Sequence, residues 1–213
     1  GGDGRLNAAE DSSVTISGTT SSAEDGQTVS INISSDGGGT PINTTANVTS
    51  NSYSVTGLDL SSLNDGTLTI TADVSDLAGN SATQASDTST KDSAAPNYTI
   101  SSDLASLQAG ETANIQFTLS ENSSNFDQTD ITVSGGSLSN FAGTGSSYTA
   151  TFTPDTNSTS NGTLSVASSA FSDSAGNLND DGHTITLTVD TSKPLFQSAA
   201  TSKDGLSFPL SYD

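Results

Sequence analysis

Residues 66–80, GTLTITADVSDLAGN, decide the fold class because apolar and polar residues alternate along them. Apolar side chains occupy positions 68, 70, 72 and 74, and this period of two places one face of a β-strand in a core and the other in water. The same period returns at 29–33, 115–119, 148–152 and 185–189. No segment shows the 3.6-residue apolar period of a helix. The chain is therefore predicted to be all-β.

Composition excludes several classes of function. The 213 residues carry 24 acids and four bases, a net charge of -20, which repels nucleic acid and anionic membranes. Without Cys there is no disulfide framework, zinc ribbon or thiol nucleophile. Acidity with few large apolar residues is typical of disorder, but the alternation argues against it. We therefore predict a folded acidic protein that binds no nucleic acid and inserts into no membrane.

Two sequence motifs recur at a fixed distance and define the domains. DLAGN at 76–80 returns as DSAGN at 173–177, 97 residues later (173 minus 76), and KDSAAP, ending at Pro96, has a counterpart in DTSKP, ending at Pro194. This period is the size of a small β-sandwich. It predicts domains at 1–95 and 96–194, and the first two strands of an incomplete third repeat at 195–213.

The incomplete repeat holds chain for strands at 196–199 and 206–212. Two strands are at best marginally stable alone. We therefore expect either a fragment of a longer repeat array or an end that pairs with a neighbouring molecule.

The first domain contains enough short strands for a Greek-key sandwich. The strands are expected at 14–17, 28–33, 44–49, 53–58, 67–74 and 81–87.

These segments resemble known β-sandwich domains. LNDGTLTITADVSDLAGN, 63–80, resembles the corner and penultimate strand of immunoglobulin-like and fibronectin-like domains, with Leu68 where many relatives carry Tyr. Segments 7–33, 52–82 and 91–96 together resemble one bacterial immunoglobulin-like repeat of giant secreted adhesins. Segments 115–154 and 171–182 resemble another such repeat, of very large bacterial surface proteins.

The resemblance implies tandem immunoglobulin-like Greek-key β-sandwiches at the bacterial cell surface or in secreted form. It also implies an extender that holds a distal binding domain away from the cell, often made rigid by calcium at domain junctions. The partners would be neighbouring repeats of the same long chain, whereas a host, surface or carbohydrate receptor would contact other domains. The fragment itself is expected to be monomeric. Residues 1–20 show no signal peptide, which carries no information for an internal fragment.

The residues give a separate argument for Ca²⁺ as a structural cofactor. In sandwich order, the loop after the second strand and the loop between the last two strands lie at the end that receives the incoming linker. In the second domain this gathers Asp92, Glu121 and Asp173. Three carboxylates without a base repel one another, whereas a hard divalent cation with six to eight oxygen ligands holds them together.

Other oxygen-bearing side chains extend this prediction. Asp25 and Asp65, in turns at the far end of the first domain, would complete the shell across the junction. The equivalent set at the chain start is Glu10, Asp36 and Asp76. Residues 177–182, NLNDDG, copy the spacing that opens an EF-hand loop, although Thr188 stands in place of its Glu. The further candidates from this loop are Asn177, Asn179 and Asp181.

An alternative without metal explains the same residues. Asp-Gly pairs at 25–26 and 65–66 are ordinary turn formers, and a polar hairpin accounts for NLNDDG.

No catalytic residue is predicted, and the chain is expected not to be an enzyme. His183 is the sole imidazole and has no serine elbow or paired base nearby. Two alternatives to an extender remain. A carbohydrate- or protein-binding immunoglobulin-like module would expose Phe126 and Phe141 at loop tips. A subunit of a surface filament or phage particle would pair its C-terminal strands with a neighbour.

Overall fold

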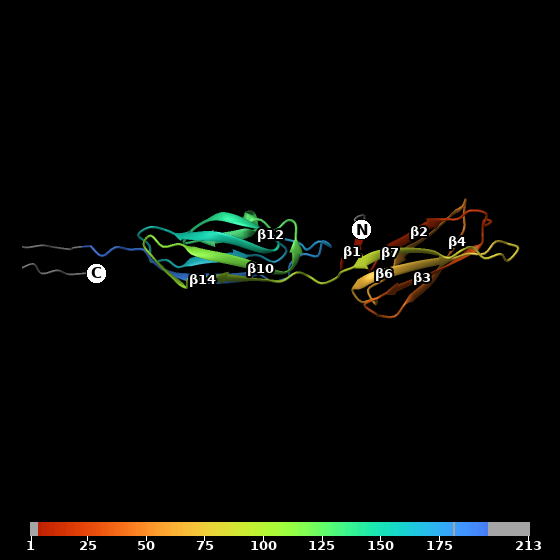
Figure 1. The fold of residues 1–213 in the computed structure, drawn as a ribbon, viewed down its shortest axis with the longest axis horizontal. Coiled ribbons are helices and arrows are strands. Elements are labelled where there is room, and N and C mark those ends of the chain that lie inside the picture. The colour runs from red at the N-terminus through yellow and green to blue at the C-terminus, as the bar shows by residue number, and fades with distance from the viewer. Residues whose placement is uncertain (1–3, 181, 196–213) are drawn as a thin grey trace, which may run out of the picture. The chain divides into compact units, whose positions relative to one another are not determined.

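The computed structural model describes residues 4–180 and 182–195. Within these ranges the chain is built from strands, with one 3-10 turn at Gln128–Asp130, which confirms the prediction of an all-β fold (Figure 1). No helix among the described residues is long and apolar enough to cross a membrane. The strands predicted at 196–199 and 206–212 lie outside the described residues.

The chain divides into two compact units. The first unit comprises Gly1–Pro96 and the loop Ser172–Leu178, and the second comprises Asn97–Phe171 and Asn179–Asp213.

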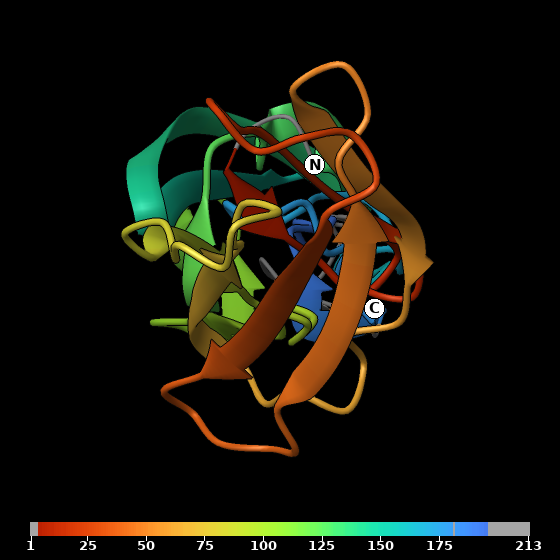
Figure 2. The ribbon, with the colours of Figure 1, turned by 90° about the vertical axis from the view of Figure 1, so that its right-hand side faces the viewer.

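The first unit is a sandwich of two sheets (Figures 1 and 2). The larger sheet has the order β1-β7-β6-β3-β4, and the smaller sheet pairs β2 with β5. Its strands are β1 (Arg5–Leu6), β2 (Val14–Thr19), β3 (Thr28–Ser35), β4 (Ile42–Asn47), β5 (Ser52–Leu58), β6 (Gly66–Asp73) and β7 (Ala85–Lys91).

Alternation explains the core of this unit. Val29, Ile31 and Ile33 on β3 are buried, and Leu68 on β6 is buried beside them. The intervening polar residues Ser30 and Thr28 are exposed. The sequence therefore places one face of the central strands in the core, as expected.

The last predicted strand of this unit is displaced along the chain. The expectation was 81–87, whereas β7 runs from Ala85 to Lys91. The difference arises because Ser81 pairs with Ser75, and the N–H of Ala82 donates to the carbonyl of Val74, so these residues extend the hairpin loop instead.

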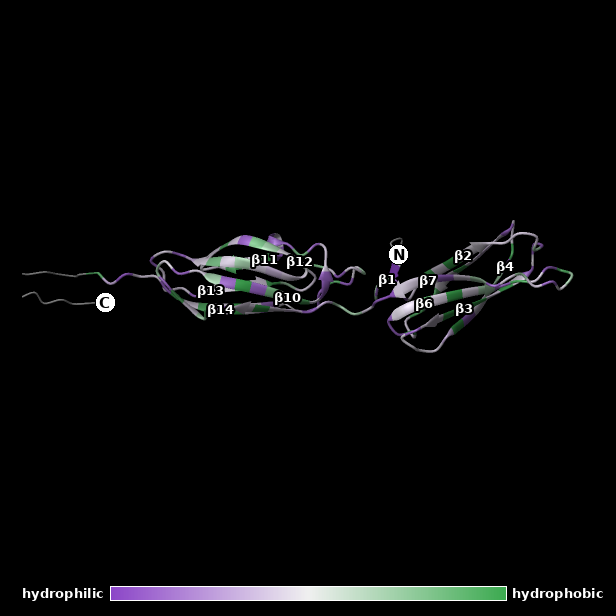
Figure 3. Ribbon diagram, in the orientation of Figure 1, coloured by the Kyte–Doolittle hydropathy of each residue, from purple (hydrophilic) through white to green (hydrophobic). Residues whose placement is uncertain are grey.

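The second unit is also a sandwich, with sheets β12-β10-β8 and β11-β13-β14-β9. Alternate residues of β10 point into its core, where Ile115, Phe117 and Leu119 are all buried. Figure 3 shows the apolar positions spaced along the strands. The strands are β8 (Tyr98–Ser102), β9 (Ser106–Gln108), β10 (Ala113–Ser123), β11 (Ile131–Ser134), β12 (Gly136–Pro154), β13 (Gly162–Val166) and β14 (His183–Asp190).

Two further aromatic side chains belong to this core: Phe126, in the loop after β10, and Phe141, which lies on β12 and not in the loop that the sequence predicts. Phe126 is only 4% exposed, and its ring centroid lies 5.0 Å from those of both Tyr148 and Phe171. Phe141 is half-buried and stacks on Tyr148 at 5.6 Å. These rings are therefore packing residues, and they do not form the exposed aromatic surface that a binding module would present.

Candidate carboxylate site and its surroundings

The two DxAGN loops have the same internal structure. In the first, Asp76 accepts hydrogen bonds from the Asn80 backbone N–H (2.8 Å) and from Asn80 Nδ2 (2.8 Å). In the second, Asp173 accepts from the Asn177 backbone N–H and from Asn177 Nδ2, each at 2.9 Å. The glycine of each loop has a positive φ, 89° at 79 and 92° at 176, which favours glycine. The motif is therefore a self-contained turn.

The hydrogen bonds of the first loop lower the pKa of Asp76 below its usual value, with the side-chain amide of Asn80 as the main cause. Asp76 is half-buried. It needs no metal to remain ionised at neutral pH.

The second loop makes additional contacts within the first unit. Asn177 Nδ2 also donates to the backbone carbonyl of Asp92 at 2.7 Å, and Asn177 Oδ1 accepts from the N–H of Ala8 at 3.0 Å. Asn7 Nδ2 donates to the carbonyl of Ala175 at 3.0 Å. These contacts bring the Asp173 turn beside the end of β7, and Asp173 itself is buried.

Three of the predicted acids come together at this place. One carboxylate oxygen of each of Asp92, Glu121 and Asp173 lies within 4.8 Å of the others. Burial raises the pKa of Asp92, and the carboxylates of Asp173 and Asp65 raise it further, while the N–H of Ala94 opposes the shift. Negative charge is therefore concentrated on partly desolvated oxygens, which is a suitable donor set for a hard cation.

Asp25 and Asp65 do not lie at one end of the first unit, contrary to the sequence prediction. In the antiparallel pair β3 and β6, Ser30 opposes Asp73 and Ser35 opposes Leu68. The turn before β3 and the turn before β6 therefore lie at opposite ends of the sheet. Asp65 accepts from Ser93 N–H and Oγ, each at 2.9 Å, at the Asp92 end, whereas Asp25 accepts from the N–H of Ser50 at 2.7 Å.

The set proposed at the chain start is not assembled either. Asp36 follows β3 and accepts from the N–H of Thr67 (2.7 Å), whereas Asp76 follows β6 and so lies at the other end of the sheet. Glu10 precedes β2 and accepts from the N–H of Asn7 at 3.4 Å. In the ranges that the structure describes, no group of three potential metal ligands contains any of these acids.

The structure does not bring the residues of the EF-hand-like segment, Asn177, Asn179 and Asp181, together as one ligand set in the part of the chain that it describes. Asn177 holds the Asp173 turn, and Asp181 lies outside the described residues. Asn179 is 1% exposed, and its Oδ1 accepts from the N–H groups of Ala170 (2.7 Å) and Phe171 (3.0 Å). Its Nδ2 donates to the carbonyl of Ala167 at 2.8 Å. Asn179 therefore organises the backbone of residues 167–171.

Replacing Asn179 by Ala is expected to lower the free energy of unfolding of the second unit by about 1–3 kcal/mol, because the buried N–H of Phe171 and the partly buried N–H of Ala170 lose their acceptor. Urea denaturation followed by amide hydrogen exchange on β10 measures this. Asn114→Ala, on an exposed position of β10, is the control and should change stability by no more than about 0.5 kcal/mol. Equal effects of the two substitutions would contradict the assigned role.

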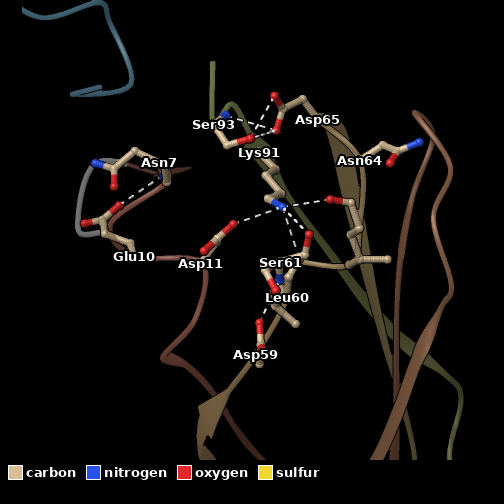
Figure 4. Close-up of polar contacts among 12 residues, drawn as sticks. Asn7, Glu10, Asp11, Asp59, Leu60, Ser61, Asn64, Asp65, Lys91 and Ser93 are labelled. Atoms are coloured by element: carbon tan, nitrogen blue, oxygen red, sulfur yellow. Dashed lines mark hydrogen bonds and ion pairs between the residues drawn. The ribbon is translucent and has the colours of Figure 1, made fainter. Parts of the chain in front are cut away.

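One buried charge was not singled out from the sequence. Lys91 lies at the end of β7 with its side chain 2% exposed, and its Nζ is 3.1 Å from Oδ2 of Asp11 (Figure 4). The ammonium also donates to the carbonyls of Leu60 (3.1 Å) and Leu63 (2.7 Å), and more weakly to that of Ser61 (3.4 Å). Lys91 therefore fixes the 60–63 turn and the segment before β2 to β7.

The signal for Lys91 was present in the sequence but not distinctive. It is one of only four basic residues in the chain, and it precedes the Asp92 linker. Nothing in the local pattern indicates that its partner is Asp11, 80 residues earlier.

Comparisons with solved structures found similar proteins, among them a repeat segment of an adhesion protein and a set of fibronectin(III)-like modules. A crystal structure of a tetra-tandem repeat in the extending region of a large adhesion protein is 24% identical, with a TM-score of 0.37 over 90% of this chain and 50% of that one. The fibronectin(III)-like modules of Clostridium thermocellum CbhA are 14% identical, with a TM-score of 0.33 over 88% of this chain and 90% of that one. The chain thus spans about half the length of the adhesion-protein fragment. No curated protein matched.

The family comparison gives a specific result for the second sandwich. Immunoglobulin-like domains are structural modules that are typically non-enzymatic, in agreement with the prediction that the chain is not an enzyme. Residues 92–190 match the family described as a bacterial Ig-like domain. This range contains Asp92, Glu121 and Asp173 and the strands β8 to β14.

Proposed function

We propose that this chain is a segment of a structural extender in a large secreted or cell-surface bacterial adhesin. In this proposal, calcium bound by Asp92, Glu121 and Asp173 stiffens the segment. The bacterial Ig-like match over 92–190 and the recurrence of its motifs along the chain support a repeat architecture.

The observation that carries the calcium proposal is the convergence of the three carboxylates. Calcium binds oxygens at about 2.3–2.6 Å, so two ligands of one ion lie no more than about 5 Å apart. The oxygens of Asp92, Glu121 and Asp173 satisfy this limit. Burial is the main cause of the raised pKa of Asp92, and repulsion from the Asp173 carboxylate adds to it; a divalent cation would relieve that repulsion.

The chemistry of the donors also selects the type of ion. All three are carboxylates, and the chain has no Cys and a single His. Such a set suits hard cations and offers nothing to soft metals. The Asp173 oxygens already accept amide hydrogens from Ala175 and Asn177, so the turn is formed before an ion binds.

The surface fits a spacer better than a binding module. Phe126 is buried and Phe141, on β12, packs against the core, so neither ring is the exposed aromatic anchor expected of a loop-borne receptor site. A net charge of -20 favours solubility and discourages association with other anionic surfaces.

Small-angle X-ray scattering tests the stiffening. In millimolar calcium we expect a narrower distribution of maximum particle dimension than in EDTA. Asp92→Asn should remove the difference, because it removes one of the three carboxylates. Among the described residues, the Asp92 carboxylate accepts one weak hydrogen bond, from Ala94 at 3.3 Å, so the substitution spares the Asp173 turn. Asp155→Asn, at an exposed acid outside the cluster, should leave the response unchanged. Identical scattering of the wild type in calcium and EDTA would refute stiffening by calcium.

A further inference from the structure

The smaller sheets of the two units differ by one strand. In the second unit, β10 pairs with β12 on one edge and with β8 on the other. Tyr98 and Ile100 of β8 are 7% and 6% exposed and complete that core. In the first unit, β2 pairs with β5, and no other strand among the described residues pairs with β2. The edge of β2 opposite β5 therefore offers a row of backbone groups for pairing.

A groove lies along this edge. Its volume is about 850 Å³, and it is lined by residues 13–17 around β2, by residues 85–89 of β7 and by the inner face of β6. Residues 4–6 and 9–10, together with Tyr53 and Leu60, complete the lining. The opposite wall is also a sheet edge: among the described residues, β1 pairs with β7 on that side at Thr90 and Lys91, and the Ser89 hydroxyl donates to the Gly4 carbonyl at 3.1 Å. Within the described part of the chain, the groove therefore runs between the unpaired edge of β2 and residues 85–88 of β7, which no described strand pairs with on that side.

The floor of the groove is apolar but incompletely covered. On β2 and β6, four side chains that face the core near the groove are only half-buried. These are Val14 and Ile16 of β2, and Ile70 and Ala72 of β6. The corresponding residues of β10, Ile115 and Phe117, are fully buried beneath β8. The first unit therefore has a place for one further apolar strand.

We infer that this groove is a strand-acceptor site, and that residues 206–212 of a second copy of this chain fill it by pairing with the free edge of β2. The segment lies in the 18 residues after 195, outside the described structure, and carries Leu206, Phe208, Leu210 and Tyr212 on alternate positions. One face of this segment as a strand would be wholly apolar, which matches the half-buried floor.

Two further properties of the segment fit the site. It has no charged residue between Gly205 and Tyr212, so filling the groove buries no carboxylate in a chain of net charge -20. Pro209 falls out of phase with the apolar residues, and an edge strand tolerates a Pro whose missing N–H faces solvent. Donor and acceptor are different surfaces, so the contact is head-to-tail and builds open chains. The isolated chain would then assemble, in contrast to the monomer expected from the sequence.

A peptide titration tests the acceptor site directly. The acceptor is the full chain carrying Phe208→Asp and Leu210→Asp, which cannot donate its own segment, and the probe is a labelled peptide of residues 203–213. We expect saturable binding and slower amide hydrogen exchange at residues 14–19. A Phe208→Asp peptide should bind at least about tenfold more weakly, because one large apolar side chain loses its burial. A Ser207→Asp peptide, changed on the opposite face, should bind like the parent.

Light scattering on the full chain gives the second test. The wild type should show a mass that increases with concentration, Phe208→Asp should remain monomeric, and Ser207→Asp should assemble. The inference is overturned if the wild type is monomeric at all concentrations, if the peptide fails to bind at millimolar concentration, or if protection appears away from β2. It is also overturned if a peptide of residues 195–201 binds as tightly, because the site would then accept a different segment.

Discussion

Replacing Lys91 by Met should lower the free energy of unfolding of the first unit by about 3–5 kcal/mol, because it leaves a buried carboxylate without its counter-ion. The ammonium is 2% exposed, lies 3.1 Å from Asp11 and donates to the carbonyls of Leu60 and Leu63. Met preserves most of the apolar stem of the side chain, so the loss reports on the charge and its hydrogen bonds. Asp11, 11% exposed, would have to bind water or a proton instead.

Amide hydrogen exchange under native conditions measures this effect separately in each unit. The protection of β3 should fall with Lys91→Met, whereas that of β10 should not, because the substitution lies in the first unit. Lys193→Met removes an exposed Lys and serves as the matched control, with an expected change within about 0.5 kcal/mol. A loss below about 1 kcal/mol at β3 would show that Lys91 is not the residue that holds this end of the sandwich together.

Replacing Phe126 by Ala should lower the free energy of unfolding of the second unit by about 3–5 kcal/mol, since it opens a cavity in the core. The ring lies 5.6 Å from Phe117 and 5.0 Å from both Tyr148 and Phe171, centroid to centroid. Although Phe126 follows β10 in a loop, it is 4% exposed and its environment is that of a core residue.

Urea denaturation of Phe126→Ala, with exchange protection on β10 as the reporter, checks this value. Leu104→Ala is the control in the same unit, because Leu104 is 38% exposed and should cost much less. A Phe126→Ala variant as stable as the wild type would contradict the assignment of this ring to the core, and it would favour the hypothesis that the loop is a receptor-binding site.

The fold class could be predicted because the alternation of apolar and polar residues within each strand is visible in a short stretch of sequence. Alternation at 115–119 and 148–152 identifies both the strands and the residues they bury. The displaced β7 shows the limit of this reasoning. Its sequence, ASDTSTK, contains few apolar residues, so the pairing of Ser75 with Ser81, which the pattern does not reveal, decides where the strand begins.

The candidate site was only partly accessible to sequence reasoning. Asp92, Glu121 and Asp173 were placed together from the order of strands alone, and their oxygens are within 4.8 Å of one another. The prediction that Asp25 and Asp65 lie at the same end of the first unit was wrong. The position of a turn at one end or the other depends on which strands pair and in which direction, and the sequence does not show this. Asp-Gly turns look alike at either end of a sheet, so composition could not separate them.

Lys91 illustrates a different limit. A lone Lys at a strand end is ordinarily solvated, and its burial follows from the 60–63 turn presenting carbonyls toward it. The half-buried side chains of β2 and β6 show the same limit of sequence-based prediction. Alternation predicts which face of the strand they lie on, but it does not predict whether another strand covers that face.

The calcium-stiffened extender is tested most directly by thermal unfolding of the full chain in EDTA and in millimolar calcium, for the wild type, Asp92→Asn and Asp155→Asn. If calcium binds the native state at the three carboxylates, free calcium at a hundred times the dissociation constant adds about 2.7 kcal/mol to its stability. The melting temperatures of the wild type and Asp155→Asn should then rise with calcium, and that of Asp92→Asn should not. Equal melting temperatures of the wild type in EDTA and in calcium, or an undiminished rise in Asp92→Asn, would contradict the account.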